Sequence, residues 1–402
     1  MATTEITAPE TGTEDFRAEA AAWLAENFAQ SLVGKENLLA VIEGDSDPDP
    51  EVAAWKKAMG EKGWGTPTWP KAYGGGGLDS KQARILQDEM AKINAWNPIG
   101  GLGVMMLGPT LLEFASEEQK QRYIPPICRG EIRWCQGYSE PGAGSDLASL
   151  QTKCEDRGDH WLINGQKTWT SGGQWADWCF ALVRTDTSKK HEGISFILLD
   201  MKSPGVEVKP IQMISGASPF CETFFTDVKV PKDQIVGEIG NGWTIGKRLL
   251  QHERTNLSGG GRMGRGGGPS LADIAKNYVG VDDQGRLADS DLRSRIIKHD
   301  MEARAFQATA RRVTAEAKSG EVSLASSILK NVGARITQER AELTLEIMGM
   351  QGLGWEGDGF HPLELGSTRG WLWGKAVSIY GGTTEIQNNV IAKRILGMLD
   401  HQ

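Results

Sequence analysis

Apolar side chains recur every three or four residues at both ends of the chain, a spacing typical of amphipathic helices. Near the N-terminus this apolar face comprises Phe16, Ala20, Trp23, Leu24 and Phe28. Segments 80–95 and 103–115 contain long apolar stretches with few β-branched runs, and the Gly/Pro-rich segment 63–77 predicts a loop between helices. The first third of the chain is therefore predicted to be helical.

The pattern changes between residues 131 and 240, where short β-type runs appear. Strands are predicted at 179–185, 194–200 and 224–230, and Asn164-Gly165 between two apolar runs predicts a hairpin. This block is too short for a parallel sheet with crossover helices, so a small antiparallel barrel or sandwich is expected.

Helical patterns return from residue 241, which makes the predicted fold class α+β. We expect a disordered polar tail at 1–14, an N-terminal helical domain at 15–130, a β domain at 131–240 and a C-terminal helical domain at 241–402. The glycine-rich GGGRMG at 259–264 follows a helix end and has no βαβ unit around it, so it is not a dinucleotide fingerprint.

Composition narrows the classes of function. The net charge of −8 is spread without a basic block, which argues against nucleic acid or an anionic membrane as main partner. Five cysteines without CxxC spacing and six histidines without HxH or HxxxH pairs predict reduced thiols and no metal site. The N-terminus lacks signal-peptide features and no stretch is long enough to span a membrane, so we expect a cytoplasmic protein.

One carboxylate interrupts an apolar helix face. Glu253 lies in a stripe with Ile245, Leu249, Leu250 and Leu257. A carboxylate there is either a structural partner of a basic residue or a base whose pKa is raised by burial. The stripe alone does not decide between these two interpretations.

Three further motifs could bind a ligand. QGYSEPGAGSDLASL (136–150) forces a turn with available backbone N–H groups and hydroxyls, which suits a phosphate or a flavin ring edge. In GQKTWTSGG (165–173), Trp169 is either core or a stacking surface for a flat cofactor. Near the C-terminus, Gly381-Gly382 precede a predicted capping box from Thr384 to Gln387, which is either an anion site or only a well-capped helix.

Together, GYSEPGAGSDLASLQT, NGQKTWTSGG, the terminal YGGTTEIQ and the helix–β–helix order resemble the acyl-CoA dehydrogenases over residues 15–398. The resemblance implies FAD bound between the β domain and the C-terminal helices of a tetramer. The isoalloxazine and its ribityl chain would be held by Gln136, Tyr138, Ser139, Ser145, Trp169 and Ser171. The dinucleotide part would be contacted by Gly352 and, across a subunit boundary, by Thr383 and Glu385.

The resemblance also implies which residue acts as the catalytic base that removes the substrate proton. The family's common Y-E-G-T glutamate is absent, because this chain has Gly381 at that position. A minority, including isovaleryl-CoA and long-chain acyl-CoA dehydrogenases, carries the base in an E-R pair on the first helix after the β domain, and the matching residues are Glu253 and Arg254. This implies that Glu253 removes the α-proton, that the Gly381 N–H supports the thioester oxygen, and that Arg254 and Ser145 also bind substrate.

The sequence differs from the family pattern at one motif. The usual RxxFG, whose arginine reaches the FAD pyrophosphate, is missing from 275–296, where Arg286 or Arg293 could substitute. This weakened pattern is similar to bacterial steroid- and branched-side-chain enzymes, some of which are α2β2 heterotetramers.

Three functions therefore remain open. The first is acyl-CoA dehydrogenation with an electron-transferring flavoprotein as acceptor, and an oxidase variant of it is open too. The second is a subunit that needs a paralogous partner to complete its FAD site. The third is a non-catalytic acyl-CoA-binding subunit. The sequence does not identify the acyl group.

Overall fold

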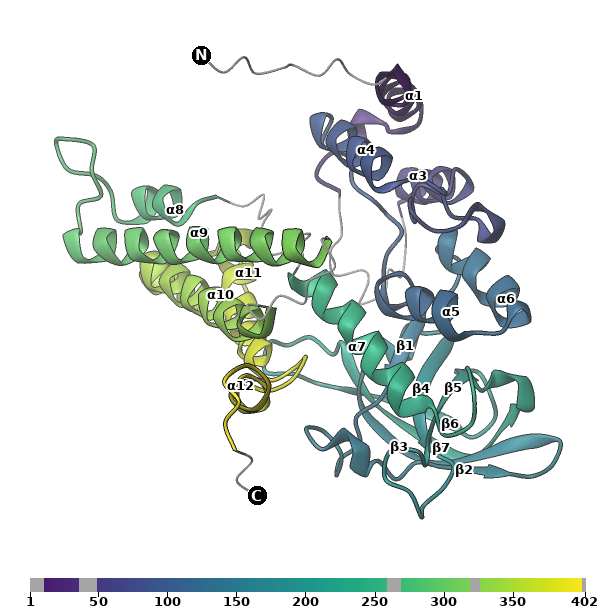
Figure 1. Cartoon of the computed structure of the whole chain (residues 1–402). Helices are drawn as coiled ribbons and strands as arrows, with labels where there is room; N and C mark the ends of the chain where they lie inside the picture. Colours follow the sequence, from purple (N-terminus) through teal and green to yellow (C-terminus); the bar gives the residue numbers. More distant parts are fainter. Residues whose placement is uncertain (1–10, 36–48, 259–268, 319–325, 400–402) are drawn as a thin grey trace. The chain divides into compact units, whose positions relative to one another are not determined.

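The computed structural model describes residues 11–35, 49–258, 269–318 and 326–399 (Figure 1). Two compact units divide the chain. The first comprises the residues up to Ile211 together with Ser218–Leu249, and the second comprises Gln212–Ala217 and the residues from Leu250 onward.

The first unit begins with helices, as predicted. They are α1 (Thr11–Asn27), α3 (Pro50–Glu61), α4 (Ser80–Lys92), α5 (Gly108–Phe114), which follows a π-helical turn at Gly103–Leu107, and α6 (Glu117–Cys128). The predicted stripe of α1 is buried at Phe16, Ala20, Leu24 and Phe28. Helix α1 already begins at Thr11, inside the segment 1–14 predicted as a tail, and residues 1–10 lie outside the described part.

Capping sequences fix where these helices begin. The Asp79 carboxylate accepts hydrogen bonds from the Lys81 and Gln82 amides, and the Gln82 side-chain oxygen accepts one from the Asp79 amide. Ser116 and Gln119 form the same reciprocal capping box before α6. Both boxes satisfy amides that a helix start otherwise leaves without partners.

The middle of the chain forms one seven-stranded sheet. Its strands are β1 (Trp134–Gly137), β2 (Lys153–Asp156), β3 (His160–Ser171), β4 (Trp178–Arg184), β5 (Ile194–Asp200), β6 (Val206–Ile211) and β7 (Phe220–Pro231). The order is β1-β4-β2-β3-β7-β6, with β5 also paired to β4. Most pairs are antiparallel as expected, but β4 runs parallel to both β1 and β2.

The predicted hairpin at Asn164-Gly165 is wrong. Strand β3 continues through both residues with an irregularity in its pairing to β7, and the β2–β3 connection lies between Asp156 and His160. Two contacts explain why Asn-Gly is used inside a strand. The Asn164 side chain exchanges hydrogen bonds with Asp227, and a Cβ at Gly165 would lie 2.6 Å from the Thr152 hydroxyl.

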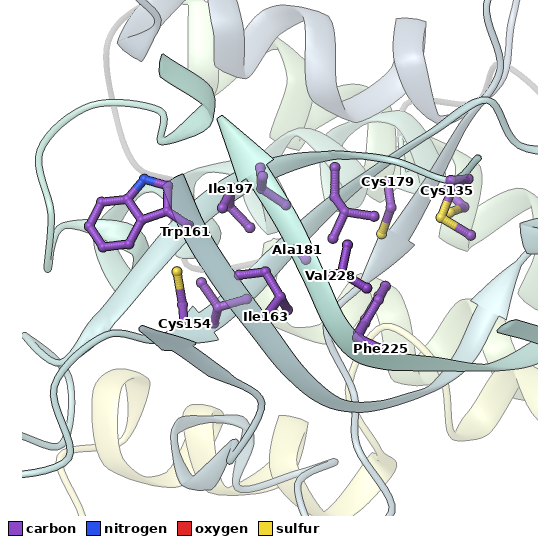
Figure 2. Packing of buried hydrophobic residues seen from close by; sticks show 13 residues of the cluster. Cys135, Cys154, Trp161, Ile163, Cys179, Ala181, Ile197, Phe225 and Val228 are labelled. Atoms are coloured by element: carbon purple, nitrogen blue, oxygen red, sulfur yellow. The ribbon is translucent and has the colours of Figure 1, made fainter. Parts of the chain in front are cut away.

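Buried apolar side chains from most strands form the core of this sheet (Figure 2). Strands β4 and β5 are buried along nearly their whole length, which explains their continuous apolar sequences. Cys135 and Cys179 are direct partners on β1 and β4 and are completely buried. Burial raises the pKa of Cys135 and keeps its thiol protonated and unreactive.

The remaining helices follow. They are α7 (Gly242–Ser258), which contains the division between the units, α8 (Leu271–Tyr278), α9 (Ser290–Lys318), α10 (Ser326–Met348), α11 (Pro362–Gly374) and α12 (Thr384–Val390), which continues into a π-helical turn at Ile391–Ile395. In the second unit, Leu271, Ile296 and Ile347 are among the buried residues that pack α8, α9 and α10 together.

Candidate functional site

Strand β1 and the turn that follows it hold four of the predicted ligand-binding residues: Gln136 in the strand, and Tyr138, Ser139 and Ser145 after it. Tyr138 is buried, Gln136 and Ser139 are half-buried, and Ser145 is exposed. The turn closes through two reciprocal backbone hydrogen bonds of 3.0 Å between Glu140 and Ala143. Its tip is open, because Cβ atoms at Gly142 and Gly144 would meet nothing within 4 Å.

A buried ion pair under this turn was not predicted from the sequence. The Lys167 ammonium donates to the Glu140 carboxylate at 2.7 Å, and Lys167 is wholly buried. The same carboxylate accepts from the backbone N–H groups of Gln151 and Thr152. Burial raises the Glu140 pKa, but attraction to Lys167 and these hydrogen bonds outweigh it and hold the pKa below its ordinary value. Burial lowers the pKa of Lys167, against the attraction of Glu140.

Trp169 points away from the core because β3 contains a bulge. The pairing of β3 with β7 shifts between Lys167 and Thr170, both of which are buried. In a regular strand, side chains alternate between the two faces, and Trp169 would lie on the same face as the buried Lys167. The bulge leaves two residues, Thr168 and Trp169, between the buried Lys167 and Thr170, which breaks this alternation. Its backbone is left-handed, with φ of 60°, and its side chain is 54% exposed.

The exposed indole is oriented by its neighbours. Trp169 meets Phe220 edge to face, with ring centroids 6.0 Å apart. The next residue, Thr170, accepts a buried hydrogen bond of 3.1 Å from Thr223, and Ser171 is half-buried at the end of β3. A flat aromatic surface beside hydroxyl groups can stack on a planar ligand. The sequence signal for this feature was the Trp among small hydroxyl residues, but the bulge is what exposes the ring.

Helix α7 packs its first turns against the same sheet. A Cβ at Gly242 would lie 2.3 Å from the Ser195 carbonyl carbon, and one at Gly246 would lie 3.5 Å from the Tyr138 hydroxyl oxygen. Ile245 and Leu249 are completely buried, in agreement with the predicted stripe. The backbone of α7 continues through Glu253 and Arg254. The side chains of these two predicted residues lie outside the described part, so their contacts are not assigned.

The predicted residues Gly381, Thr383 and Glu385 belong to the second unit, where they form a separate group. Gly381 and Gly382 have positive φ of 67° and 95°, which favours glycine at both positions. The helix cap is Thr383 and not the predicted Thr384, since the Thr383 hydroxyl accepts from the Ile386 amide. The Gln387 side chain donates to the Gly381 carbonyl and does not complete a capping box.

Glu385 is exposed in the first turn of α12. Hydrogen bonds from its own amide and from Thr383, together with the charge of Lys330, lower its pKa. This carboxylate therefore stays ionised at neutral pH and can accept hydrogen bonds from hydroxyl or amino groups of a ligand.

Gly352 has a packing explanation within the second unit. Its carbonyl accepts a hydrogen bond of 3.0 Å from Thr368, and a Cβ there would lie 2.7 Å from the Leu345 carbonyl oxygen. A glycine is therefore required for close approach to α10, whether or not Gly352 also contacts a ligand.

The structure also places the two arginines considered as substitutes for RxxFG. Arg286 is held in a turn by the carboxylate of Asp282, at 2.9 Å. Arg293 donates to the Leu287 carbonyl at 3.3 Å. Both guanidinium groups thus have partners within their own segment.

The described residues contain no group of three or more His, Cys, Asp or Glu side chains arranged to hold a metal ion. Among them there is also no helix long and apolar enough to cross a membrane.

Comparison with known proteins gives consistent matches along the chain. The models for the N-terminal, middle and C-terminal domains of acyl-CoA dehydrogenase match residues 13–131, 135–228 and 240–396. The chain is 34% identical to acyl-CoA dehydrogenase IpdE1 of Mycolicibacterium smegmatis, covering 96% of this chain and 97% of the relative. Identity to IpdE1 of Mycobacterium tuberculosis is also 34%, with the same coverage.

Solved structures agree with these matches. The Tcur3481-Tcur3483 steroid ACAD is 29% identical, with a TM-score of 0.76 and coverage of 98% of this chain and 99% of that one. The ChsE4-ChsE5 complex from Mycobacterium tuberculosis is 27% identical, with a TM-score of 0.75 and coverage of 98% and 100%. The expected α+β architecture is confirmed, and the chain belongs to the acyl-CoA dehydrogenase family of flavoprotein oxidoreductases.

Proposed function

We propose that this chain catalyses the FAD-dependent α,β-dehydrogenation of an acyl-CoA thioester to the 2-enoyl-CoA. The observation that carries the proposal is the match of three consecutive acyl-CoA dehydrogenase domains across nearly the whole chain. Relatives covered almost end to end at 34% identity are themselves named acyl-CoA dehydrogenases.

The first unit fits a flavin. The exposed indole of Trp169, the hydroxyl of Ser171 and the open turn after Tyr138 lie on elements of one sheet. Gln136, Ser139 and Ser145 would add hydrogen bonds to the ring and ribityl chain. Gly352 would contact the dinucleotide part of FAD, and Thr383 and Glu385 would contact it from an adjoining subunit. When bound, FAD supplies the oxidant, because its isoalloxazine ring accepts the hydride that leaves the substrate β-carbon.

The base in this proposal is Glu253. An α-proton of a thioester is weakly acidic, so its base must be close, desolvated and shifted upward in pKa. Glu253 lies on α7 four residues after the buried Leu249, in the apolar stripe predicted from the sequence. The Gly381 N–H would donate to the thioester oxygen where enolate charge develops, and Arg254 and Ser145 would also bind substrate.

The acyl group in this proposal carries a branch or a ring near the reacting carbons. A glycine at 381, where most of the family has glutamate, leaves space beside the reacting carbons for a branch or a ring. A solved relative at 29% identity is a steroid ACAD, which supports a substrate that contains a ring. Electrons would pass to an electron-transferring flavoprotein.

A heteromeric enzyme is the second candidate. Two solved relatives above 25% identity carry paired names, Tcur3481-Tcur3483 and the ChsE4-ChsE5 complex. The RxxFG arginine is absent, and both Arg286 and Arg293 already have partners. A paralogous subunit would then supply the missing cation at the FAD pyrophosphate, in a tetramer that contains both chains.

Two measurements test these proposals. The visible spectrum of the purified chain separates the candidates, since a yellow homo-oligomer favours the first and flavin retained only with a paralogue favours the second. A chain that binds acyl-CoA but no flavin in either preparation would instead be a non-catalytic subunit.

The base is tested separately with Glu253→Gln. It should keep fold and flavin and lose on the order of 100-fold or more in turnover. Lys247→Gln is the control, because it removes an exposed charge from the same helix. Normal turnover by Glu253→Gln would exclude this base.

A further inference from the structure

The left-handed backbone of Trp169 is an unfavourable conformation for a residue with a large side chain. Such conformations persist where the surrounding structure enforces them, and they concentrate at functional sites. The residues on both sides of the β3 bulge provide this enforcement.

Lys167 fixes the start of the bulge. Its ammonium donates to the Tyr138 carbonyl at 3.2 Å and to the Glu140 carboxylate at 2.7 Å. The neighbouring Thr168 amide donates to the Ser139 carbonyl at 2.8 Å. Three hydrogen bonds therefore join the strand that carries Trp169 to the segment Tyr138–Glu140.

The end of the bulge is fixed to β7. Thr170 is completely buried, and its hydroxyl accepts from Thr223 at 3.1 Å. Two residues later the Gly172 amide donates to the Pro219 carbonyl at 2.8 Å. Trp169 is thus held between two anchored points, which leaves its backbone little freedom.

Glu140 and a second buried cation, Arg184, fix the base of the predicted ligand-binding turn. Glu140 holds the Gln151 and Thr152 amides at 2.6 and 2.9 Å. The buried guanidinium of Arg184 donates to the Ala148 carbonyl at 2.6 Å and to the Leu150 carbonyl at 3.2 Å. The turn is therefore rigid at its base, while its tip at Gly142 and Gly144 is open.

Stability alone is a weak reason for this arrangement. Removing two charges from water costs about as much as their attraction returns, so well-packed apolar residues often serve a fold equally well. What apolar residues cannot provide is a set of directed hydrogen bonds between two segments. Lys167 and Glu140 provide that connection between the two segments predicted to contact the flavin.

We propose that Lys167 and Glu140 are a positioning pair that sets the Trp169 indole relative to the Tyr138–Ser139 backbone, and thereby the geometry in which the flavin ring is held. This inference rests on the proposed function for its ligand. Because Lys167 is wholly buried and Glu140 nearly so, the pair acts through its neighbours and touches neither cofactor nor substrate.

The test uses the full chain with Lys167→Met and Glu140→Gln combined, which removes both charges at similar volume. The matched control is Lys202→Met with Asp177→Asn, an exposed pair at 3.0 Å in the same unit. Three quantities are measured: amide hydrogen exchange of residues 139–149 without flavin, the FAD dissociation constant, and the visible flavin spectrum. The folded double variant should exchange faster in this segment, bind FAD roughly tenfold or more weakly, corresponding to about 1.4 kcal/mol, and show a shifted flavin spectrum, whereas the control should match the parent.

Each result decides the proposal. Unchanged FAD affinity and spectrum in a folded double variant, or unchanged exchange at 139–149, would overturn it and leave the pair a merely structural one. A parent chain that binds no flavin, alone or with a paralogue, would overturn the proposed function, while the exchange rates would still show whether the pair holds the turn. If the double variant does not fold, Thr170→Val releases the other end of the bulge and is measured in the same way.

Discussion

Removing the Lys167 ammonium alone should be among the most damaging single changes in the β domain. Lys167→Met preserves much of the side-chain volume but leaves Glu140, which is only 7% exposed, without its cation. Breaking a buried ion pair in this way typically costs about 3–5 kcal/mol, because the remaining charge stays desolvated. We expect a loss of this size in the free energy of unfolding at pH 7.

The loss should depend on pH. In the parent, the Glu140 pKa is held below the ordinary value for a glutamate, which is about 4.3. The pair therefore stabilises the fold at pH values above that ordinary value, and this contribution disappears as pH falls through the lowered pKa of the folded state. In Lys167→Met, burial remains and should raise the Glu140 pKa. Glu140 then takes up a proton more readily in the folded state, and the penalty of the variant shrinks as pH falls.

Urea unfolding of parent and variant at several pH values between 8 and 5 measures both effects. Lys202→Met is the control, since it makes the same substitution at an exposed ion pair and should change stability little. The reasoning would be refuted by a penalty below about 1 kcal/mol at pH 7, or by a penalty that stays constant as pH falls.

Three other changes test separate parts of the site. Trp169→Gly relieves a left-handed backbone worth about 1–2 kcal/mol but loses an aromatic contact worth about 0.5–1.5 kcal/mol. The free energy of unfolding in urea should therefore change by no more than about 1.5 kcal/mol, while FAD titration shows weaker binding; a large stability loss would mean that the backbone is not strained. Gly352→Ala places a Cβ 2.7 Å from a backbone oxygen of α10 and should destabilise by about 1–3 kcal/mol. Gly366→Ala, whose Cβ meets nothing within 4 Å on α11, should be neutral or stabilising when both glycine variants are measured by urea unfolding, and equal effects at both glycines would contradict the packing argument. Gly381→Glu in a Glu253→Gly background should recover some activity on straight-chain acyl-CoA if residues 253 and 381 flank the same substrate carbon. The φ of 67° at residue 381 strains any side chain at that position. If the variant keeps its fold and flavin but recovers no activity, that result would count against the shared geometry.

Local patterns in the sequence were sufficient to predict most of the helices and strands. Most of the described residues in the two predicted stripes are buried, with Trp23 and Leu250 half-buried, because helical periodicity depends on neighbours three and four residues away. Strand β5 occupies the predicted residues 194–200 because an uninterrupted apolar run suits a strand buried on both faces. The predicted hairpin failed because Asn164 and Gly165 are used for contacts with Asp227 and Thr152, which no local pattern reveals.

Order of elements, fold class and the position of the candidate ligand-binding motifs were thus determined by the sequence itself. Tertiary structure decided how those motifs are presented. Trp169 is exposed because a bulge in the pairing of β3 with β7 breaks the alternation of the strand, and that pairing depends on residues about fifty positions away. Lys167 and Glu140 are 27 residues apart and appear in the sequence as two ordinary charged residues. Only folding removes them from water together, and this shared desolvation makes them a buried pair that joins the two segments of the site.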